Sequence, residues 1–174
     1  DMDIKASLNN LLIPYTSNYA GTLLPGIREY TVTPGEKTTT ISGKGKAGLK
    51  QEENYYFFYL PVCYKGITGK SYAYYNTSRS KNLYLPASGD ENYSYDIQLP
   101  ENLTLCTPIQ EKKIDNPIGS FKITLTSEGS SLHIELALQI KKQLITPAEY
   151  PAFRSLITEW TDRTRKPILF KTVQ

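Results

Sequence analysis

Residues 121–140 constrain the fold of this chain more than any other stretch, because polar and apolar side chains alternate along most of them. Apolar residues take every second position in 121–125 and again in 132–140. A β-strand sends successive side chains to opposite faces, so the pattern predicts two strands, each with one apolar and one polar face. Gly129 lies between them and can adopt positive φ, which predicts a hairpin. Because a two-stranded ribbon alone is marginal in water, its apolar face needs a second layer.

Most of the chain before this hairpin is predicted to form further strands. Short runs rich in aromatic and β-branched residues, separated by Pro and Gly, are typical of strands joined by turns. The expected strands are 27–33, 37–42, 54–60, 70–77, 79–85, 93–99 and 109–114. The run 54–60 is aromatic or apolar after its first residue, which predicts a central strand buried on both faces. The charged run 109–114 is expected at a sheet edge.

The period of the pattern changes after residue 145, where a helix is expected. Thr146 and Glu149 have the spacing of a capping box, and Pro147 fits the first helical position. Apolar residues then recur at spacings of three and four: Tyr150, Phe153, Leu156, Ile157 and Trp160. The pattern predicts one amphipathic helix over about 147–161, followed by a short final strand at 168–170.

These elements predict an all-β fold, a two-layer antiparallel β-sandwich of about nine to ten strands with one C-terminal amphipathic helix and a short final strand. With 174 residues, the chain can bury a core without disulfides. We expect residues 1–20, whose signal is mixed, to be a linker or leading segment from an upstream domain. The β-sandwich domain is expected over 21–174. The 14 Tyr residues suit half-exposed positions on its sheets.

Charge and hydropathy exclude some classes of partner. The net charge is +3 and the Lys and Arg residues are dispersed, which does not favour nucleic-acid binding. No apolar run is long enough for a membrane span, and the first residues lack the layout of a signal peptide. Any export signal is therefore expected outside this chain.

Residues that could carry chemistry are few. The one histidine, His133, is predicted on the polar face of a strand, and neither Cys63 nor Cys106 opens a helix that would stabilise a thiolate. The two cysteines either form a disulfide or lie as small buried side chains. One histidine and two separated cysteines do not complete a zinc shell, and the glycine-rich residues 43–48 lack the phosphate-loop pattern. We expect no catalytic, metal or cofactor-binding site in this chain.

The order of several motifs from residue 54 onward resembles a known family. An aromatic run ends in Leu-Pro at Pro61, a second motif follows at 79–86, and a strand ends at Pro100. A hairpin at 116–140 comes next, then a Tyr-x-x-Phe-Arg helix and a hydrophobic strand at 168–170. The motif residues are Arg79, Pro86, Pro100, Tyr150, Phe153 and Arg154. Over 54–174 this order resembles the β-rich C-terminal domain of unknown function in bacterial proteins with a transglutaminase-like core, which belong to the papain-like cysteine protease superfamily.

In that family the catalytic Cys, His and Asp lie in the core that precedes the β-rich domain. The resemblance therefore implies a non-catalytic accessory domain that packs on, or shapes access to, an upstream transglutaminase-like core. It also implies an exported protein of a Gram-negative bacterium, located in the periplasm, at the outer membrane or outside the cell. The tyrosines support an alternative, a module that binds carbohydrate or peptide. Under either hypothesis, the expected contact surface is Leu12, Tyr15, Tyr72, Tyr74 and Tyr75.

Overall fold

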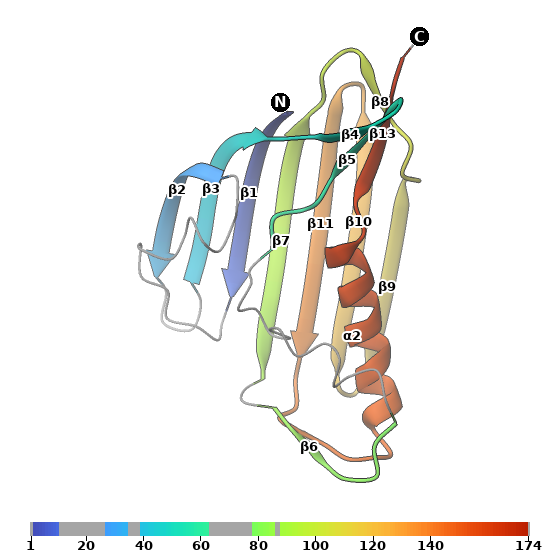
Figure 1. Ribbon diagram of the computed structural model, residues 1–174. Helices are drawn as coiled ribbons and strands as arrows, with labels where there is room; N and C mark the ends of the chain where they lie inside the picture. Colours follow the sequence, from blue (N-terminus) through green and yellow to red (C-terminus); the bar gives the residue numbers. More distant parts are fainter. Residues whose placement is uncertain (1, 11–26, 35–38, 63–77, 86–87, 174) are drawn as a thin grey trace.

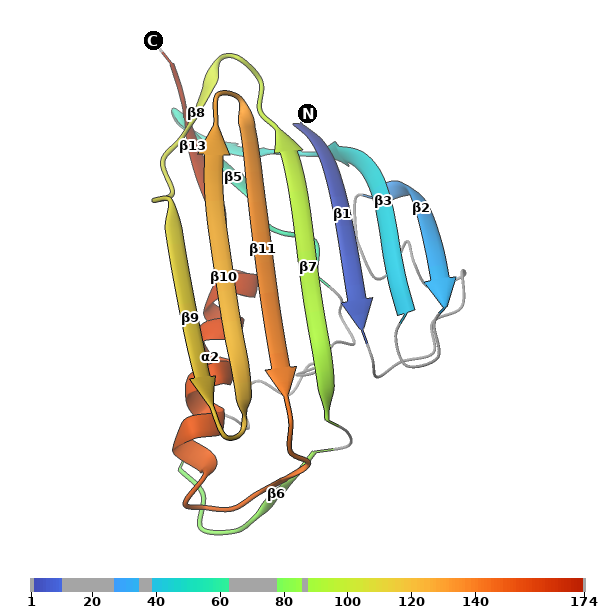
Figure 2. The ribbon, with the colours of Figure 1, turned by 180° about the vertical axis from the view of Figure 1, so that it is seen from behind.

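The computed structural model describes residues 2–10, 27–34, 39–62, 78–85 and 88–173. They form two antiparallel sheets, a two-stranded ribbon and one helix. Figure 1 shows the smaller sheet and the helix on the same side of the larger sheet. Figure 2, from behind, shows the other side of the larger sheet with no described element in front of it. The predicted fold class is confirmed: an antiparallel β-sandwich with one C-terminal helix and a final strand.

The larger sheet has seven strands and the smaller sheet has four. In spatial order the larger sheet contains β2 (Ile27–Pro34), β3 (Thr39–Ala47), β1 (Met2–Asn10), β7 (Gly89–Gln98), β11 (Ser131–Ile140), β10 (Gly119–Glu128) and β9 (Gln110–Asn116). The smaller sheet contains β4 (Lys50–Glu52), β5 (Tyr55–Phe58), β13 (Ile168–Thr172) and β8 (Leu103–Leu105). The ribbon pairs β12 (Leu144–Ile145) with β6 (Leu83–Tyr84), and the helix is α2 (Tyr150–Arg165).

The hairpin at residues 121–140 forms as predicted. Strands β10 and β11 pair without a break from Gly119 opposite Ile140 to Glu128 opposite Ser131. Gly129 lies in the turn with a φ of 57°. The apolar residues of both strands face the second layer and are buried, while the polar residues face outward. The predicted edge position of 109–114 is also confirmed, because β9 is the last strand of the larger sheet.

Helix α2 covers the inner face of the larger sheet with its apolar stripe. Phe153, Leu156, Ile157 and Trp160 are all buried, as their spacing predicts. The helix begins at Tyr150 and ends at Arg165, later at both ends than the expected range. Its last turns are polar, so the apolar pattern did not reveal them. Ion pairs one turn apart, Arg163 with Glu159 and Lys166 with Asp162, support this extension.

The prediction of a linker over 1–20 is wrong for Met2–Asn10. These residues form β1, which pairs with β3 on one side and with β7 on the other. Ile4 lies opposite Ile97 and Leu8 lies opposite Tyr93. The apolar positions of β1 are therefore in register with the apolar positions of the core strand β7. Residues 3–9 do alternate polar with apolar, and the cluster of leucines before Pro14 obscured that signal. Residues 11–20 lie outside the described part of the chain.

Other strand predictions were partly wrong. Strand β5 is an inner strand of its sheet, as expected, but only one of its faces is buried: Phe58 is in the core and Tyr55 is exposed. Of the expected strand 79–85, only Leu83–Tyr84 is paired. The expected strand 70–77 lies outside the described residues. The glycine-rich residues 43–47 continue β3.

Candidate functional site

The motif residues near α2 form a packed cluster. The guanidinium carbon of Arg79 lies 5.9 Å from the ring centroid of Tyr150, within the range of a cation–π contact. The rings of Tyr150 and Phe153 are 6.1 Å apart, and both side chains are buried. Arg154 is exposed on the other side of the helix. The Pro100 carbonyl accepts a hydrogen bond from the Leu103 amide and so closes a turn. Pro86 lies outside the described residues. The buried Tyr150 and Phe153 thus hold the start of α2 against the core.

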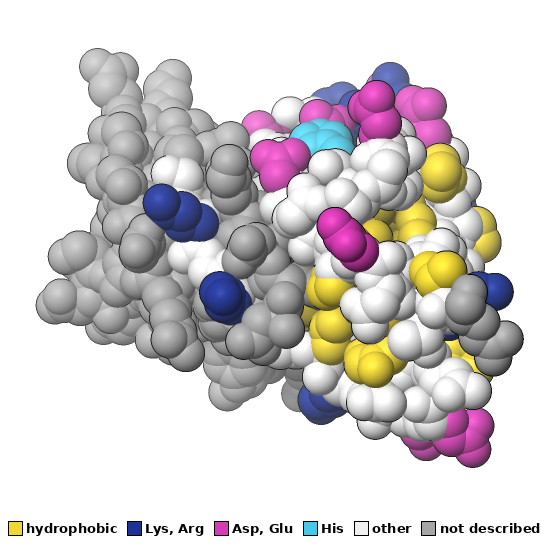
Figure 3. All heavy atoms as spheres, turned by 90° about the horizontal axis from the view of Figure 1, so that it is seen from above, with side chains coloured by type: hydrophobic (Ala, Val, Ile, Leu, Met, Phe, Trp, Pro, Cys, Tyr) yellow, Lys and Arg dark blue, Asp and Glu magenta, His cyan; other side chains and the backbone are white. Residues whose placement is uncertain are grey.

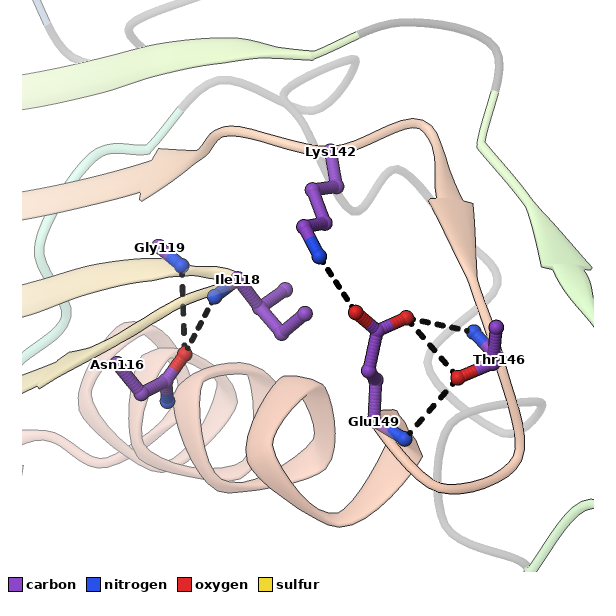
Figure 4. A network of polar contacts seen from close by, with 6 residues as sticks. All are labelled: Asn116, Ile118, Gly119, Lys142, Thr146 and Glu149. Atoms are coloured by element: carbon purple, nitrogen blue, oxygen red, sulfur yellow. Dashed lines mark hydrogen bonds and ion pairs between the residues drawn. The ribbon is translucent and has the colours of Figure 1, made fainter.

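A polar network joins the start of α2 to two turns (Figure 4). The Asn116 side-chain oxygen accepts hydrogen bonds from the amides of Ile118 at 2.9 Å and Gly119 at 3.3 Å. Its amide nitrogen donates to the Ala152 carbonyl on α2 at 3.1 Å. Asn116 therefore closes the β9–β10 turn and fixes it against the helix at the same time.

The reciprocal hydrogen bonds of the predicted capping box form on the other side of this network, but they lie in the turn before α2. The N-cap of the helix is Glu149, so Pro147 precedes the helix and is not its first residue as predicted. The Thr146 amide donates to the Glu149 carboxylate at 3.1 Å, and the Glu149 amide donates back to the Thr146 hydroxyl at 3.4 Å. Lys142 also binds the Glu149 carboxylate, as Figure 4 shows. The hydrogen bond from Lys142, together with those from Thr146, lowers the pKa of Glu149 to about 2. These contacts stabilise the ionised carboxylate in the folded protein.

Replacing Glu149 with Gln should therefore change how stability depends on pH. The ordinary pKa of a glutamate is 4.5, and that of Glu149 in the fold is about 2. The stabilisation is fully present above about pH 4.5 and is lost as the pH falls toward 2. In thermal melts at pH 7, we expect the wild type to have a higher midpoint than Glu149→Gln. This difference in midpoint should disappear as the pH falls from about 4.5 to about 2. The matched control Glu101→Gln, at an exposed turn position, should follow the wild type at every pH.

A second cluster of charges lies on the outer face of the larger sheet. His133 Nδ1 is 2.7 Å from Asp96 Oδ1, and Glu135 accepts a hydrogen bond from Lys122 at 2.9 Å. That bond is the main reason why the pKa of Glu135 is lowered and the pKa of Lys122 is raised. In Figure 3 the histidine, in cyan, has acidic side chains in magenta beside it. The predicted polar-face position of His133 is thus correct.

Cys106 and His133 lie in different layers of the sandwich. The Cys106 amide donates to Leu169 of the smaller sheet, whereas His133 points outward from the larger sheet, with the core between them. Cys106 is a free cysteine, and Cys63 lies outside the described residues. Within the described ranges, no cluster of His, Cys, Asp and Glu is suited to hold a metal ion. The same part of the chain contains no helix long and apolar enough to cross a membrane.

Aromatic side chains are exposed on the outer face of the smaller sheet. Phe58 and Leu60 point into the core, so the alternating residues Tyr55, Phe57 and Tyr59 point outward. Tyr55 is 44% exposed and Tyr59 is 49% exposed. We call this surface, made up of Tyr55, Phe57, Tyr59, Lys50, Leu169 and Lys171, the outer tyrosine face.

The flanking residues of the outer tyrosine face come from neighbouring strands. On β13, Leu169 lies opposite Phe57 and Lys171 lies opposite Tyr55. On β4, Lys50 lies opposite Phe57, and its ammonium group is 5.7 Å from the ring centroid of Tyr59. Sequence reasoning missed this surface because it predicted burial of β5 on both faces. Residues 55–60 are aromatic or apolar at every position, so the sequence pattern does not distinguish the two faces.

The surface predicted from the sequence is not described by the structure. All five of its residues, Leu12, Tyr15, Tyr72, Tyr74 and Tyr75, lie outside the described ranges. That prediction stays untested.

Comparison with known proteins gave two matches. A family of domains of unknown function for which a structure has been solved, DUF3858, matches residues 54–170, about two thirds of the chain. The match begins just before β5 and includes α2. A crystal structure of a protein described as a "putative protease" from Parabacteroides distasonis has 31% sequence identity to the chain and a TM-score of 0.62. The alignment covers 70% of this chain but only 24% of that protein. No curated protein sequence matches the chain significantly.

Proposed function

Since the chain belongs to the DUF3858 family of domains of unknown function, we propose that it acts as a non-catalytic accessory domain of a larger, protease-related protein. The observation that carries this proposal is the likeness to about a quarter of a protein described as a "putative protease", at 31% identity. A segment of that size fits one domain among several. The remaining length of such a protein has room for a separate catalytic domain.

The chemistry of the described residues supports a non-catalytic role. A cysteine nucleophile needs a base within hydrogen-bond reach, and the sandwich core lies between Cys106 and His133. His133 is instead held by Asp96 on an open sheet face. Two buried phenols are bound within the core: Tyr93 donates to Glu91, and Tyr95 donates to the Pro61 carbonyl at 2.7 Å. Burial, and secondarily the nearby Glu91, raises the pKa of Tyr95 well above its ordinary value, so this phenol stays protonated.

We further propose that the larger protein carries a transglutaminase-like core upstream of this domain, and that the domain packs on that core or shapes access to it. The order of motifs from Pro61 to Phe170 supports this arrangement. The same resemblance supports export to the periplasm, the outer membrane or the exterior of a Gram-negative bacterium. The exposed Tyr55 and Tyr59 favour a second candidate function, binding of a carbohydrate or peptide on the sheet surface.

The purified 174-residue chain is expected to have no protease or transglutaminase activity, because no nucleophile and base are placed together among its described residues. Casein hydrolysis and amine transfer to casein are the assays that check this. The full reading frame that encodes the chain should show activity if its upstream core is functional. Turnover by the isolated chain that is lost in Cys63→Ser, Cys106→Ser or His133→Ala would contradict the proposal.

A further inference from the structure

We propose that the outer tyrosine face is the surface through which this domain docks on the catalytic part of its larger protein. This inference rests on the proposed accessory function and names the surface that the function uses. The docked partner is a folded protein surface with an apolar centre. It covers Tyr55, Phe57 and Tyr59 on β5.

The two outer faces of the sandwich differ in chemistry. On the larger sheet, every outward position of β7, β11 and β10 is polar except Ala137. Four of its charged groups form two pairs, Lys122 with Glu135 and His133 with Asp96. Such a face is already adapted to water. The outer tyrosine face instead presents two exposed tyrosines and a half-buried Phe57, although the core is already filled from the other side of β5.

The arrangement of the outer tyrosine face matches a protein interface. Protein interfaces have an aromatic or apolar centre surrounded by a polar rim, and tyrosine is enriched in them. Here Tyr55, Phe57 and Leu169 form the centre. Lys50, Glu52 and Lys171 lie on the strands at either side and are exposed. Sites for small ligands are mostly concave, whereas this surface is one face of a sheet, and this difference favours a protein partner over a sugar.

The position of the smaller sheet also suits docking. Both ends of the chain lie at the same end of the molecule as β5 and β13 (Figure 1). In a larger protein, chain that continues from either end therefore starts at this end of the molecule. The family match begins at residue 54, directly before β5, so Tyr55, Phe57, Tyr59 and Leu169 of the outer tyrosine face belong to the part of the chain that the family shares.

Tyrosine nitration would test the inference. The 174-residue chain and the protein encoded by its full reading frame are treated with tetranitromethane, and the modified residues are mapped by mass spectrometry. We expect Tyr55 and Tyr59 to react at least about tenfold more slowly in the full-length protein, because docking removes the exposed rings from solvent. Tyr84 is the internal control, since it is 73% exposed on β6, outside the smaller sheet, and should react equally in both.

A variant pair gives an independent measurement. In the full-length protein, Tyr55→Ser combined with Tyr59→Ser should raise hydrogen exchange of β5 to the rate found in the isolated chain, whereas Tyr84→Ser should not. Equal nitration of Tyr55 and Tyr59 in both proteins would overturn the docking surface while leaving the accessory function intact. A reading frame without a second domain would overturn the accessory function itself. Protection of both tyrosines in the isolated chain by cellohexaose or chitohexaose would overturn docking in favour of a sugar-binding surface.

Discussion

Replacing Trp160 with Ala is expected to lower the free energy of unfolding by about 3–5 kcal/mol, the usual cost of removing a large buried aromatic side chain. Trp160 is only 2% exposed, and its ring centroid lies 5.9 Å from that of Tyr93 on β7. Its side chain thus connects α2 directly to the larger sheet. Alanine cannot fill the space, and the neighbouring core residues can close the cavity only in part.

Thermal denaturation measures this effect. For a chain of this size, each kcal/mol shifts the midpoint by about 2–4 °C, so we expect a fall of roughly 10 °C. Arg154→Ala is the matched control on the same helix, because Arg154 is exposed and its loss should change stability by less than about 0.5 kcal/mol. An unchanged midpoint for Trp160→Ala would mean that α2 does not pack on the sheet as described.

The elements with a regular period were predictable from the sequence. Strands β10 and β11 follow a strict period of two with glycine at the turn, and α2 follows spacings of three and four behind a capping box. In both cases one local pattern determines both the element and its buried face. The edge position of β9 was also predictable, because its charged side chains suit the edge of a sheet.

The candidate site was not predictable in the same way. A run such as Tyr55–Phe58 is apolar at every position, so its sequence cannot reveal which face lies outward. The answer depends on pairing with β13, more than a hundred residues later, whose Ile168 and Phe170 face the core. Strand β1 was missed for a related reason. Its alternation of polar and apolar residues is short, and it is identified as a strand only by its pairing with Ile97 and Tyr93 of β7. Long-range pairing determines both features.

Two separate roles for aromatic residues follow from this arrangement. Tyr93, Tyr95 and Trp160 are buried between the layers and hold the larger sheet against α2. Tyr55 and Tyr59 add little to that core and remain in solvent. The high tyrosine content therefore has no single explanation. A destabilising change in the first group would disturb the fold. A change in the second group would leave the isolated chain folded and, under the docking proposed above, would affect only that contact.

Strand β10 begins at a glycine that has no room for a side chain. A Cβ atom added to Gly119 would lie 1.9 Å from the backbone oxygen of Gln139 and 2.9 Å from its carbonyl carbon. Both atoms belong to the paired strand β11 and cannot rotate away. The turn before Gly119 is fixed as well. The Asn116 side-chain oxygen accepts hydrogen bonds from the amides of Ile118 and Gly119, and the Ile118 carbonyl accepts one from the Lys141 amide at 2.8 Å. The backbone can relieve the clash only by breaking part of this pairing.

Gly119→Ala is therefore expected to destabilise the protein by about 3 kcal/mol or more, at the upper end of the cost of overpacking. Urea denaturation followed by circular dichroism would measure the loss. Gly48→Ala is the matched control, because a Cβ there has no atom within 4 Å and the same substitution should be nearly neutral. Asn116→Ala should weaken the same turn by a smaller amount, about 1–3 kcal/mol, through the loss of its hydrogen bonds. If Gly119→Ala and Gly48→Ala unfold at the same urea concentration, the backbone of Gln139 does not exclude a side chain at position 119.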